Sequence, residues 1–303
     1  MKISGFSFVK NAIILDYPIV EAIKSALPIV DEFVIACGDS EDETTDAIRE
    51  IGDPKIKIIE TIWNPDDYTH GKSNAVQTNI ALDACTGDWC FYLQADEAVH
   101  EKHLTVIIEA CKKYLDDEKV HGFLFSYLHF WGDYKHYHWT HSWYRREVRV
   151  IRNGIGIKSW QSAQGFRLNS QKINVVQIPA EIFHYGWVRS PLKMRKKMIA
   201  LDTVHHGSRE AKNRNEPDYI PFDYGLRNNL RVYTGTHPAV MKDRMESRDW
   251  DWIPESPAEF KHDKLKVRFL SWFEENIFKS RIGEYRNYEK LGYDRSLAQF
   301  LKK

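Results

Sequence analysis

Short apolar runs alternate with helix-periodic segments along about the first 100 residues of the chain. The apolar runs predict strands at 3–9, 32–37, 55–60 and 89–93. Apolar residues at helical spacing predict helices at 20–27, 44–51, 72–85 and 103–115. Strands and helices that alternate in this way are typical of a parallel sheet covered by helices.

The pattern changes beyond residue 120. Apolar runs at 122–130, 147–152, 172–179 and 181–185 are separated by polar and aromatic loops, which predicts a mixed or antiparallel extension of the sheet. From residue 191 the pattern becomes helical and charged, most clearly at 193–202 and 265–277. We therefore predict an α/β fold: a Rossmann-like mixed sheet flanked by helices, with a C-terminal helical appendage. One domain would span 1–190, in two halves of 1–100 and 101–190, followed by a mostly helical extension over 191–303.

Composition excludes some functions. Lys and Arg number 43, as do Asp and Glu, whereas a dedicated nucleic-acid binder usually carries a basic excess. The four cysteines form no C-x-x-C pair, and we expect buried free thiols in a reducing compartment. Neither a signal peptide nor a membrane-spanning run is visible. We therefore expect a cytoplasmic protein. The basic run at 193–197 could also contact the inner face of a membrane peripherally. A solvated helix face is the more usual role of such a run.

The strand predicted at 89–93 leads directly into an acidic turn, Gln94-Ala95-Asp96-Glu97. Open α/β sheets bind their ligands beyond the carboxyl ends of the strands. A divalent cation held there by one or two carboxylates can take diphosphate oxygens at its remaining positions. The alternative is a helix N-terminus, which favours acidic residues in its first turn.

Three segments occur in the order found in family 2 glycosyltransferases: the acidic loop at 39–44, the segment at 71–89, and the acidic turn. The chain resembles this family over about its first 190 residues. The resemblance implies a GT-A fold with a nucleotide-binding half and an acceptor half. It also implies a nucleotide-diphosphate sugar as donor, and Mn²⁺ or Mg²⁺ as cofactor.

The resemblance also assigns residues near the cation. Asp96 would bind the metal, and Glu97 would be a second acid beside it and a candidate catalytic residue. Gln94 stands at the first acid of the usual triplet, where it would make an uncharged contact with ribose or metal. His184, at a predicted strand end, is a candidate second metal ligand, since imidazole suits Mn²⁺; the alternative is an ordinary hydrogen-bonded histidine.

Further residues are assigned to the donor's nucleotide. Asp39 and Asp42 lie in the loop that lines the nucleoside pocket in the family, whereas Lys72 and Asn74 open the helix that approaches the diphosphate or ribose. Lys72 can equally be a solvated lysine at a helix start. Arg149, in an arginine-rich strand, is a second candidate catalytic residue that would face phosphate or acceptor, because a guanidinium binds phosphate bidentately. The alternative is a solvated strand face.

The segment 130–143 is rich in aromatic residues and histidines. Trp131, Trp139 and Trp143 could form a platform on which an acceptor sugar stacks, or they could simply pack. Three histidines in the same segment invite a zinc site, but no Cys or acidic partner has the spacing of a structural zinc site.

The predicted function is therefore transfer of a hexose from a nucleotide diphosphate to a hydroxyl of a glycan, lipid-linked or small-molecule acceptor, as in polysaccharide biosynthesis. Inversion requires a carboxylate base, and none lies at 160–165, where relatives carry it. Glu97, Asp133 and Glu181 remain as candidates. The alternatives are a non-catalytic module that binds a nucleotide or glycan, or a nucleotidyltransferase, although the loop after the first strand lacks the glycine-rich pattern of the latter.

Overall fold

The computed structural model describes residues 1–64, 71–215, 219–227, 230–252, 264–278, 282–283 and 286–301. Its strands are β1 (Ile3–Val9), β2 (Glu32–Gly38), β3 (Ile56–Thr61), β4 (Trp89–Tyr92), β5 (Glu97–Val99), β6 (Gly122–Trp131), β7 (His136–His138), β8 (Arg146–Arg152), β9 (Ile157–Ser159), β10 (Phe166–Leu168), β11 (Gln171–Lys172), β12 (Asn174–Trp187), β13 (Leu230–Val232) and β14 (Glu289–Tyr293). Its α-helices are α1 (Ile19–Ala26), α2 (Thr44–Arg49), α3 (Lys72–Asp83), α4 (Leu104–Lys113), α5 (Pro191–His206), α6 (Ser208–Asn215), α7 (Lys242–Glu246) and α8 (Leu265–Phe273).

The N-terminal half is a parallel sheet. β4, β1, β2 and β3 lie in this order, each parallel to its neighbour. Successive side chains of β2 enter opposite faces: Phe33 and Ile35 pack with α1 and α4 on one face, whereas Val34 and Ala36 pack with α3 on the other. A strand buried on both faces is expected to be mostly apolar, which explains the apolar run from Phe33 to Cys37 in its sequence.

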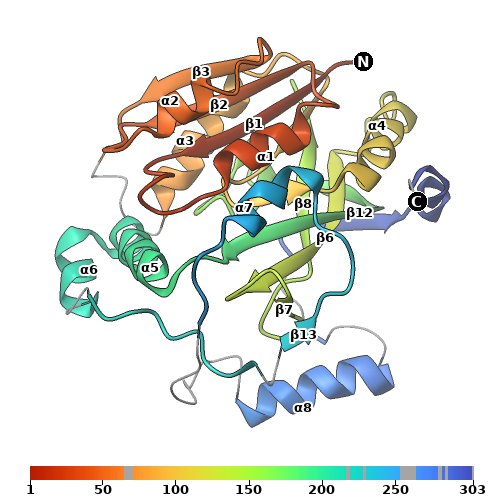
Figure 1. The fold of residues 1–303 in the computed structure, drawn as a ribbon. Helices are drawn as coiled ribbons and strands as arrows, with labels where there is room; N and C mark the ends of the chain where they lie inside the picture. Colours follow the sequence, from red (N-terminus) through yellow and green to blue (C-terminus); the bar gives the residue numbers. More distant parts are fainter. Residues whose placement is uncertain are drawn as a thin grey trace.

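The second half adds antiparallel and parallel strands beyond β4. β8 is antiparallel to β4, β6 is antiparallel to β8, and β12 is parallel to β6. The runs at 172–179 and 181–185, predicted as two strands, form the single long strand β12 (Figure 1). Pro179 is tolerated inside it because the pairing with β6 shifts register between Gln177 and Glu181.

The C-terminal residues contribute strands as well as helices. β13 pairs with β7, and β14 pairs with β12, so both join the main sheet. The helix predicted at 265–277 is shorter, since α8 ends at Phe273 and a π-helical turn, Glu274–Phe278, follows. The predicted fold class is confirmed: a mixed α/β sheet flanked by helices, with further helices on the C-terminal side (Figure 1).

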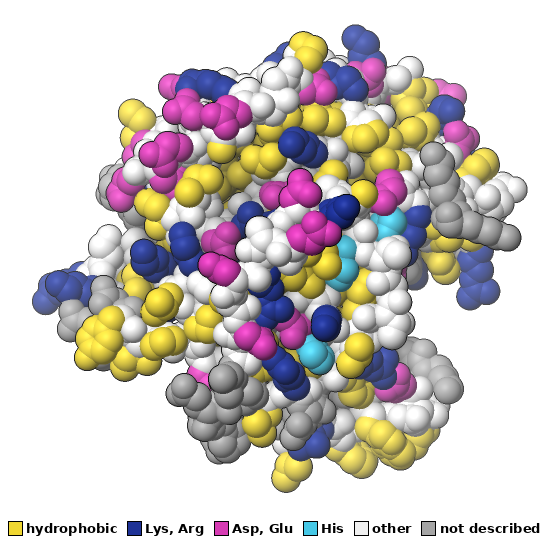
Figure 2. Space-filling model, in the orientation of Figure 1, with side chains coloured by type: hydrophobic (Ala, Val, Ile, Leu, Met, Phe, Trp, Pro, Cys, Tyr) yellow, Lys and Arg dark blue, Asp and Glu magenta, His cyan; other side chains and the backbone are white. Residues whose placement is uncertain are grey.

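Two predictions from composition can be compared with the structure. All four cysteines are buried and free, as predicted. Acidic and basic side chains are interspersed over the face drawn in Figure 2, in line with the balanced totals. In the part of the chain that the structure describes, no helix combines the length and apolarity that crossing a bilayer requires.

Candidate functional site

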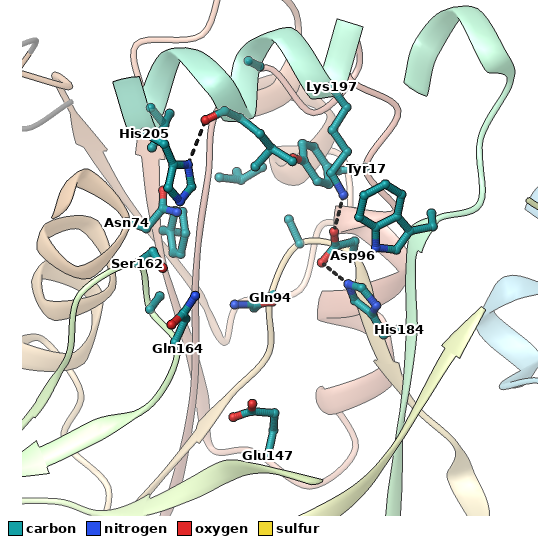
Figure 3. A pocket seen from close by; sticks show the side chains of 18 of the residues that line it. Tyr17, Asn74, Gln94, Asp96, Glu147, Ser162, Gln164, His184, Lys197 and His205 are labelled. Carbon is teal, nitrogen blue, oxygen red and sulfur yellow. Dashed lines mark hydrogen bonds and ion pairs between the residues drawn. The ribbon is translucent and has the colours of Figure 1, made fainter. Parts of the chain in front are cut away.

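A cavity of about 930 Å³ opens where the carboxyl ends of the parallel strands meet the second half of the molecule. Its walls come from the residues that follow β1 and β4, from the first turn of α3, and from β8, β12 and α5. Figure 3 shows Asp96 between the side chains of His184 and Lys197, with Glu147 on another side of the cavity. This is the position at which open α/β sheets bind ligands.

Asp96 is the centre of a buried group of charged side chains. Its Oδ1 lies 3.7 Å from Nε2 of His184, and its Oδ2 accepts a 3.0 Å hydrogen bond from Nζ of Lys197. Nδ1 of His184 lies 3.1 Å from Nδ1 of His129. The sequence segments that supply Asp96, His184 and Lys197 are far apart, and β5, β12 and α5 bring them together.

A glycine makes this close approach possible. A Cβ on Gly186 would lie 2.4 Å from Nε2 of His184 and 2.7 Å from Oδ2 of Asp96. The carbonyl oxygen of Gly186 also accepts a 2.7 Å hydrogen bond from Lys197. The H-Y-G-W sequence at 184–187 therefore supplies both a side chain and the space beside it.

Burial and charge set the protonation of the group. Burial alone would raise the pKa of Asp96, but Lys197, His184 and Arg189 hold it well below its usual range. Burial lowers the pKa of His184 to about 4, although Asp96 opposes this shift. Burial, together with the charge of Arg189, lowers the pKa of Lys197 to about 8 against the opposing effect of Asp96. At neutral pH the site thus holds a carboxylate, a neutral imidazole and an ammonium.

Lys197 was missed by sequence reasoning. A solvated helix face was the more usual interpretation of the run 193–197, but Met194 and Lys197 on that run are buried. The periodicity was misleading because a lysine at a core-facing position lowers the apparent amphipathicity of its helix. Nothing in its own segment sets Lys197 apart from the exposed Lys196.

Asp96 and His184 are compatible with a divalent cation. Their facing atoms are 3.7 Å apart, a gap that one cation with bonds of about 2.1 Å could bridge. A neutral imidazole and an ionised carboxylate are the protonation states that bind metal. The described residues contain no group of three or more His, Cys, Asp and Glu side chains arranged for a metal.

Glu97 and Arg149 form a buried pair next to this group. Glu97 is fully buried, and its Oε2 accepts a 2.7 Å hydrogen bond from Nε of Arg149. The hydroxyl of Tyr127 also donates to Glu97, as does the backbone N–H of Gln94. Arg149 lines the cavity, whereas Glu97 lies behind the lining residues. In this structure Glu97 positions the side chain of Arg149 and the acidic turn that begins at Gln94.

The residues assigned to the nucleotide divide into two sets. Asn74 and Gln94 line the cavity, whereas Asp39, Asp42 and Lys72 do not. Asp39 binds Nζ of Lys10 at 2.7 Å and the backbone N–H of Trp63 at 3.1 Å. Lys10 and Trp63 do line the cavity, so Asp39 supports its wall.

Asp42 has a local role in the fold. Its Oδ2 accepts a 2.8 Å hydrogen bond from the backbone N–H of Ile14, and its Oδ1 accepts one from the backbone N–H of Thr44 at 3.1 Å. Both oxygens thereby connect the start of α2 to the loop after β1.

The three tryptophans of the aromatic segment have different positions. Trp143 lines the cavity, whereas Trp131 is buried in a cluster with Met194 and Trp252. The Trp139 ring lies 4.2 Å from the guanidinium carbon of Arg231, away from the cavity lining. The structure brings only one of the three to the cavity.

The histidines of this segment have separate partners. His136 binds Asp133, His141 binds Glu274, and the His138 ring stacks on that of Trp143 with 4.4 Å between centroids. They therefore do not converge on a shared position.

Glu147 is a cavity-lining acid that sequence reasoning did not select. Its Oε2 lies 3.7 Å from Nη1 of Arg149. In the described part of the chain, the other acids that line the cavity are Glu41 and Asp96. Of the bases considered from the sequence, neither Asp133 nor Glu181 lines it: Asp133 binds His136, and Glu181 lies 3.4 Å from His103. Alternate residues of a strand share a face, so β8 places Glu147 on the same face as Arg149. This alternation is the sequence signal that could have pointed to Glu147.

A family model described as glycosyl transferase family 2 matches residues 17–173, more than half of the 303 residues. No curated protein sequence matches the chain.

Solved structures give low-scoring similarities. S. aureus TarS (residues 1–349) in complex with UDP is 15% identical with a TM-score of 0.37, and the match covers 67% of this chain and 65% of that one. Glucosyl-3-phosphoglycerate synthase from Mycobacterium tuberculosis, in complex with Mn²⁺, UDP and phosphoglyceric acid, is 18% identical with a TM-score of 0.29. That match covers 42% of each chain. This chain thus spans less than two thirds of the TarS fragment.

Proposed function

The chain belongs to glycosyl transferase family 2, and we propose that it transfers a sugar from a nucleotide diphosphate to an acceptor hydroxyl with inversion. The observation that carries this proposal is Asp96, held between His184 and Lys197 in the cavity at the strand ends. An ionised carboxylate there suits a cation that neutralises the leaving diphosphate.

The donor would lie across the ends of β1 and β4. Asp96 and His184 would hold Mn²⁺ or Mg²⁺, which supplies Lewis-acid stabilisation of the negative charge on the diphosphate. Asn74 and Gln94 offer amide hydrogen bonds to the ribose side of the donor. The nucleobase would stack at the end of the cavity formed by Phe8 and Trp63, whose ring centroids are 6.1 Å apart.

Glu147 is the proposed base. Its carboxylate would take the proton of the acceptor hydroxyl as that oxygen forms its bond to the anomeric carbon. The bond from the anomeric carbon to the diphosphate oxygen breaks in the same step, and the nucleotide diphosphate leaves with the electron pair. The acceptor, a glycan or lipid-linked glycan, would lie against Trp143 and Tyr144, whose rings suit sugar stacking.

Nucleotide binding tests the proposal. Purified protein is examined by thermal shift against UDP, GDP, CDP and dTDP, each with and without Mn²⁺. One diphosphate should raise the melting temperature in the presence of Mn²⁺, because a ligand that binds only the native state stabilises it. Asp96→Asn should abolish this shift, whereas Asp46→Asn, on the exposed surface of α2, should retain it.

Two outcomes would count against the proposal. If no nucleoside diphosphate shifts the melting temperature of folded protein, the donor class is refuted. If a diphosphate binds but the corresponding nucleotide-sugars are neither hydrolysed nor transferred, the protein is a nucleotide-binding module instead.

A further inference from the structure

Lys197 has an unusual environment for a lysine. Its side chain is 6% exposed, and its ammonium donates to Oδ2 of Asp96 at 3.0 Å and to the carbonyl oxygen of Gly186 at 2.7 Å. The ring centroids of Tyr17 and Trp187 lie 5.0 and 5.9 Å from Nζ. Carboxylate, carbonyl oxygen and aromatic faces are all groups that attract a cation.

A second cation lies near this pair. Arg189 is fully buried, donates from Nη1 to the carbonyl oxygen of Leu15 at 2.6 Å, and lies with its guanidinium carbon 4.8 Å from the Tyr17 ring centroid. Arg189 and Lys197 both lie against the Tyr17 ring, so two buried cations are close to each other beside one carboxylate. Excess buried charge is costly unless an opposite charge joins it. The cavity beside Lys197 is where an anion would enter.

Building on the proposed function, we propose that Lys197 is a diphosphate-binding residue that occupies the cation position at Asp96 until a metal–nucleotide complex arrives. The ammonium then leaves Asp96 and pairs with the diphosphate, while the metal takes its place on the carboxylate. Lys197 acts on the metal through Asp96, so it is a positioning residue for the cation and a binding residue for the donor.

Electrostatics supports this exchange. An ammonium and a divalent cation compete for the same carboxylate, because both cannot approach Oδ2 without strong mutual repulsion in a buried site. A diphosphate adds the negative charge that allows both cations to remain. The long, flexible stem of a lysine permits the ammonium to swing from one anion to the other. Metal alone should therefore bind poorly, and metal with nucleotide should bind well.

Mn²⁺ binding in the absence of nucleotide is the decisive measurement. Free Mn²⁺ is titrated by electron paramagnetic resonance against wild type and Lys197→Met, which keeps the length of the side chain and removes its charge. The variant should bind Mn²⁺ at least about fivefold more tightly, the lower limit of typical coupling between sites. At saturating Mn²⁺, it should bind the nucleoside diphosphate found in the thermal-shift panel about tenfold more weakly.

Two further variants separate this exchange from a structural effect. Lys196→Met changes an exposed lysine on the same helix and should leave both affinities unchanged. Lys197→Arg keeps the charge and should retain the weak Mn²⁺ affinity of the wild type. A merely structural role would weaken Mn²⁺ binding in Lys197→Met instead of tightening it.

The inference is overturned if Lys197→Met binds Mn²⁺ no more tightly than wild type, or if neither protein binds Mn²⁺. Nucleoside diphosphate binding by wild type in the same experiment distinguishes this failure from that of the proposed function. Wild type that binds none of the four diphosphates would refute the donor proposal, and with it the role of Lys197.

Discussion

At the scale of single residues, the acidic side chains in and near the cavity differ in whether they line it. Asp96 and Glu147 line it, whereas Glu97 is enclosed by Arg149, Tyr127 and a backbone N–H. The carboxylates thus differ in role because their partners differ: Asp96 and Glu147 can meet a ligand, whereas Glu97 is held by its neighbours. A buried pair such as Glu97 with Arg149 mainly sets geometry, since removing either partner leaves an uncompensated buried charge.

Replacing Glu147 by Gln should lower kcat by about 10²- to 10⁴-fold, because the amide cannot accept the acceptor's proton. Nucleoside diphosphate affinity should remain close to that of wild type, since Glu147 lies apart from Asp96 in the cavity (Figure 3). Sugar transfer is measured once a donor is known. Glu181→Gln is the matched control, because Glu181 does not line the cavity. Equal losses in both variants would contradict the assignment of the base.

At the scale of elements, one carboxylate ties the parallel strands together. Oε1 of Glu32, on β2, accepts hydrogen bonds from Ser4 of β1 at 2.6 Å and from the backbone N–H of Thr86 at 2.6 Å. Its Oε2 accepts one at 2.5 Å from Lys57 of β3. The group lies at the end of the sheet opposite to the cavity, since Ser4 is the second residue of β1 and Glu32 the first of β2. Its role is therefore stability.

This group should make stability depend on pH. Burial alone would raise the pKa of Glu32, but hydrogen bonds from Lys57, Ser4 and Thr86 lower it to about 2. A lowered folded-state pKa contributes stability that is complete above the unfolded value of about 4.5 and is lost as pH falls towards 2. Because the Lys57 side chain is 57% exposed, solvent screens this interaction, and the contribution is about 1–2 kcal/mol at neutral pH.

Urea unfolding of wild type and Glu32→Gln at pH 7 and pH 3 measures this effect. The variant should be less stable at pH 7, and the difference should shrink at pH 3. Glu60→Gln on β3 is the control, because its side chain is 69% exposed and its removal should matter little. If the difference in unfolding free energy between wild type and variant is the same at both pH values, Glu32 contributes through packing and not through its charge.

At the scale of the whole molecule, the C-terminal residues belong to the main body. β14 pairs with β12, and Leu297, 2% exposed, packs in the same cluster as α1 and α4. Asp294 binds Lys113 at 2.7 Å and Tyr114 at 2.9 Å, near the end of α4. Segments far apart in the sequence therefore stabilise each other.

Leu297→Ala should destabilise the protein by about 2–4 kcal/mol, because it removes a buried side chain and leaves a cavity. Urea unfolding followed by tryptophan fluorescence measures the change, with Leu301→Ala as the control, since Leu301 is 36% exposed. A single transition at lower urea is expected. If Leu297→Ala leaves the urea midpoint of unfolding unchanged, the C-terminal residues do not contribute to the stability of the sheet.

The sequence by itself determined the parallel half of the fold and the position of Asp96. β2 and β4 are largely apolar runs, and α1 follows β1 with apolar residues at helical spacing. Such patterns are local, because burial on two faces dictates each residue type. The acidic turn after β4 is equally local, and the family resemblance followed from the order of these motifs.

The family resemblance anticipated that His184 lies near Asp96, but only the tertiary structure decided that Lys197 meets it. Lys197 lies 101 positions away in the chain, and nothing in its own segment distinguishes it from the exposed Lys196. The same is true of Glu97, whose burial against Arg149 depends on how β5 and β8 pack. Charged side chains acquire their roles from partners that folding brings near, and a pattern of apolar and polar positions carries no information on those distances.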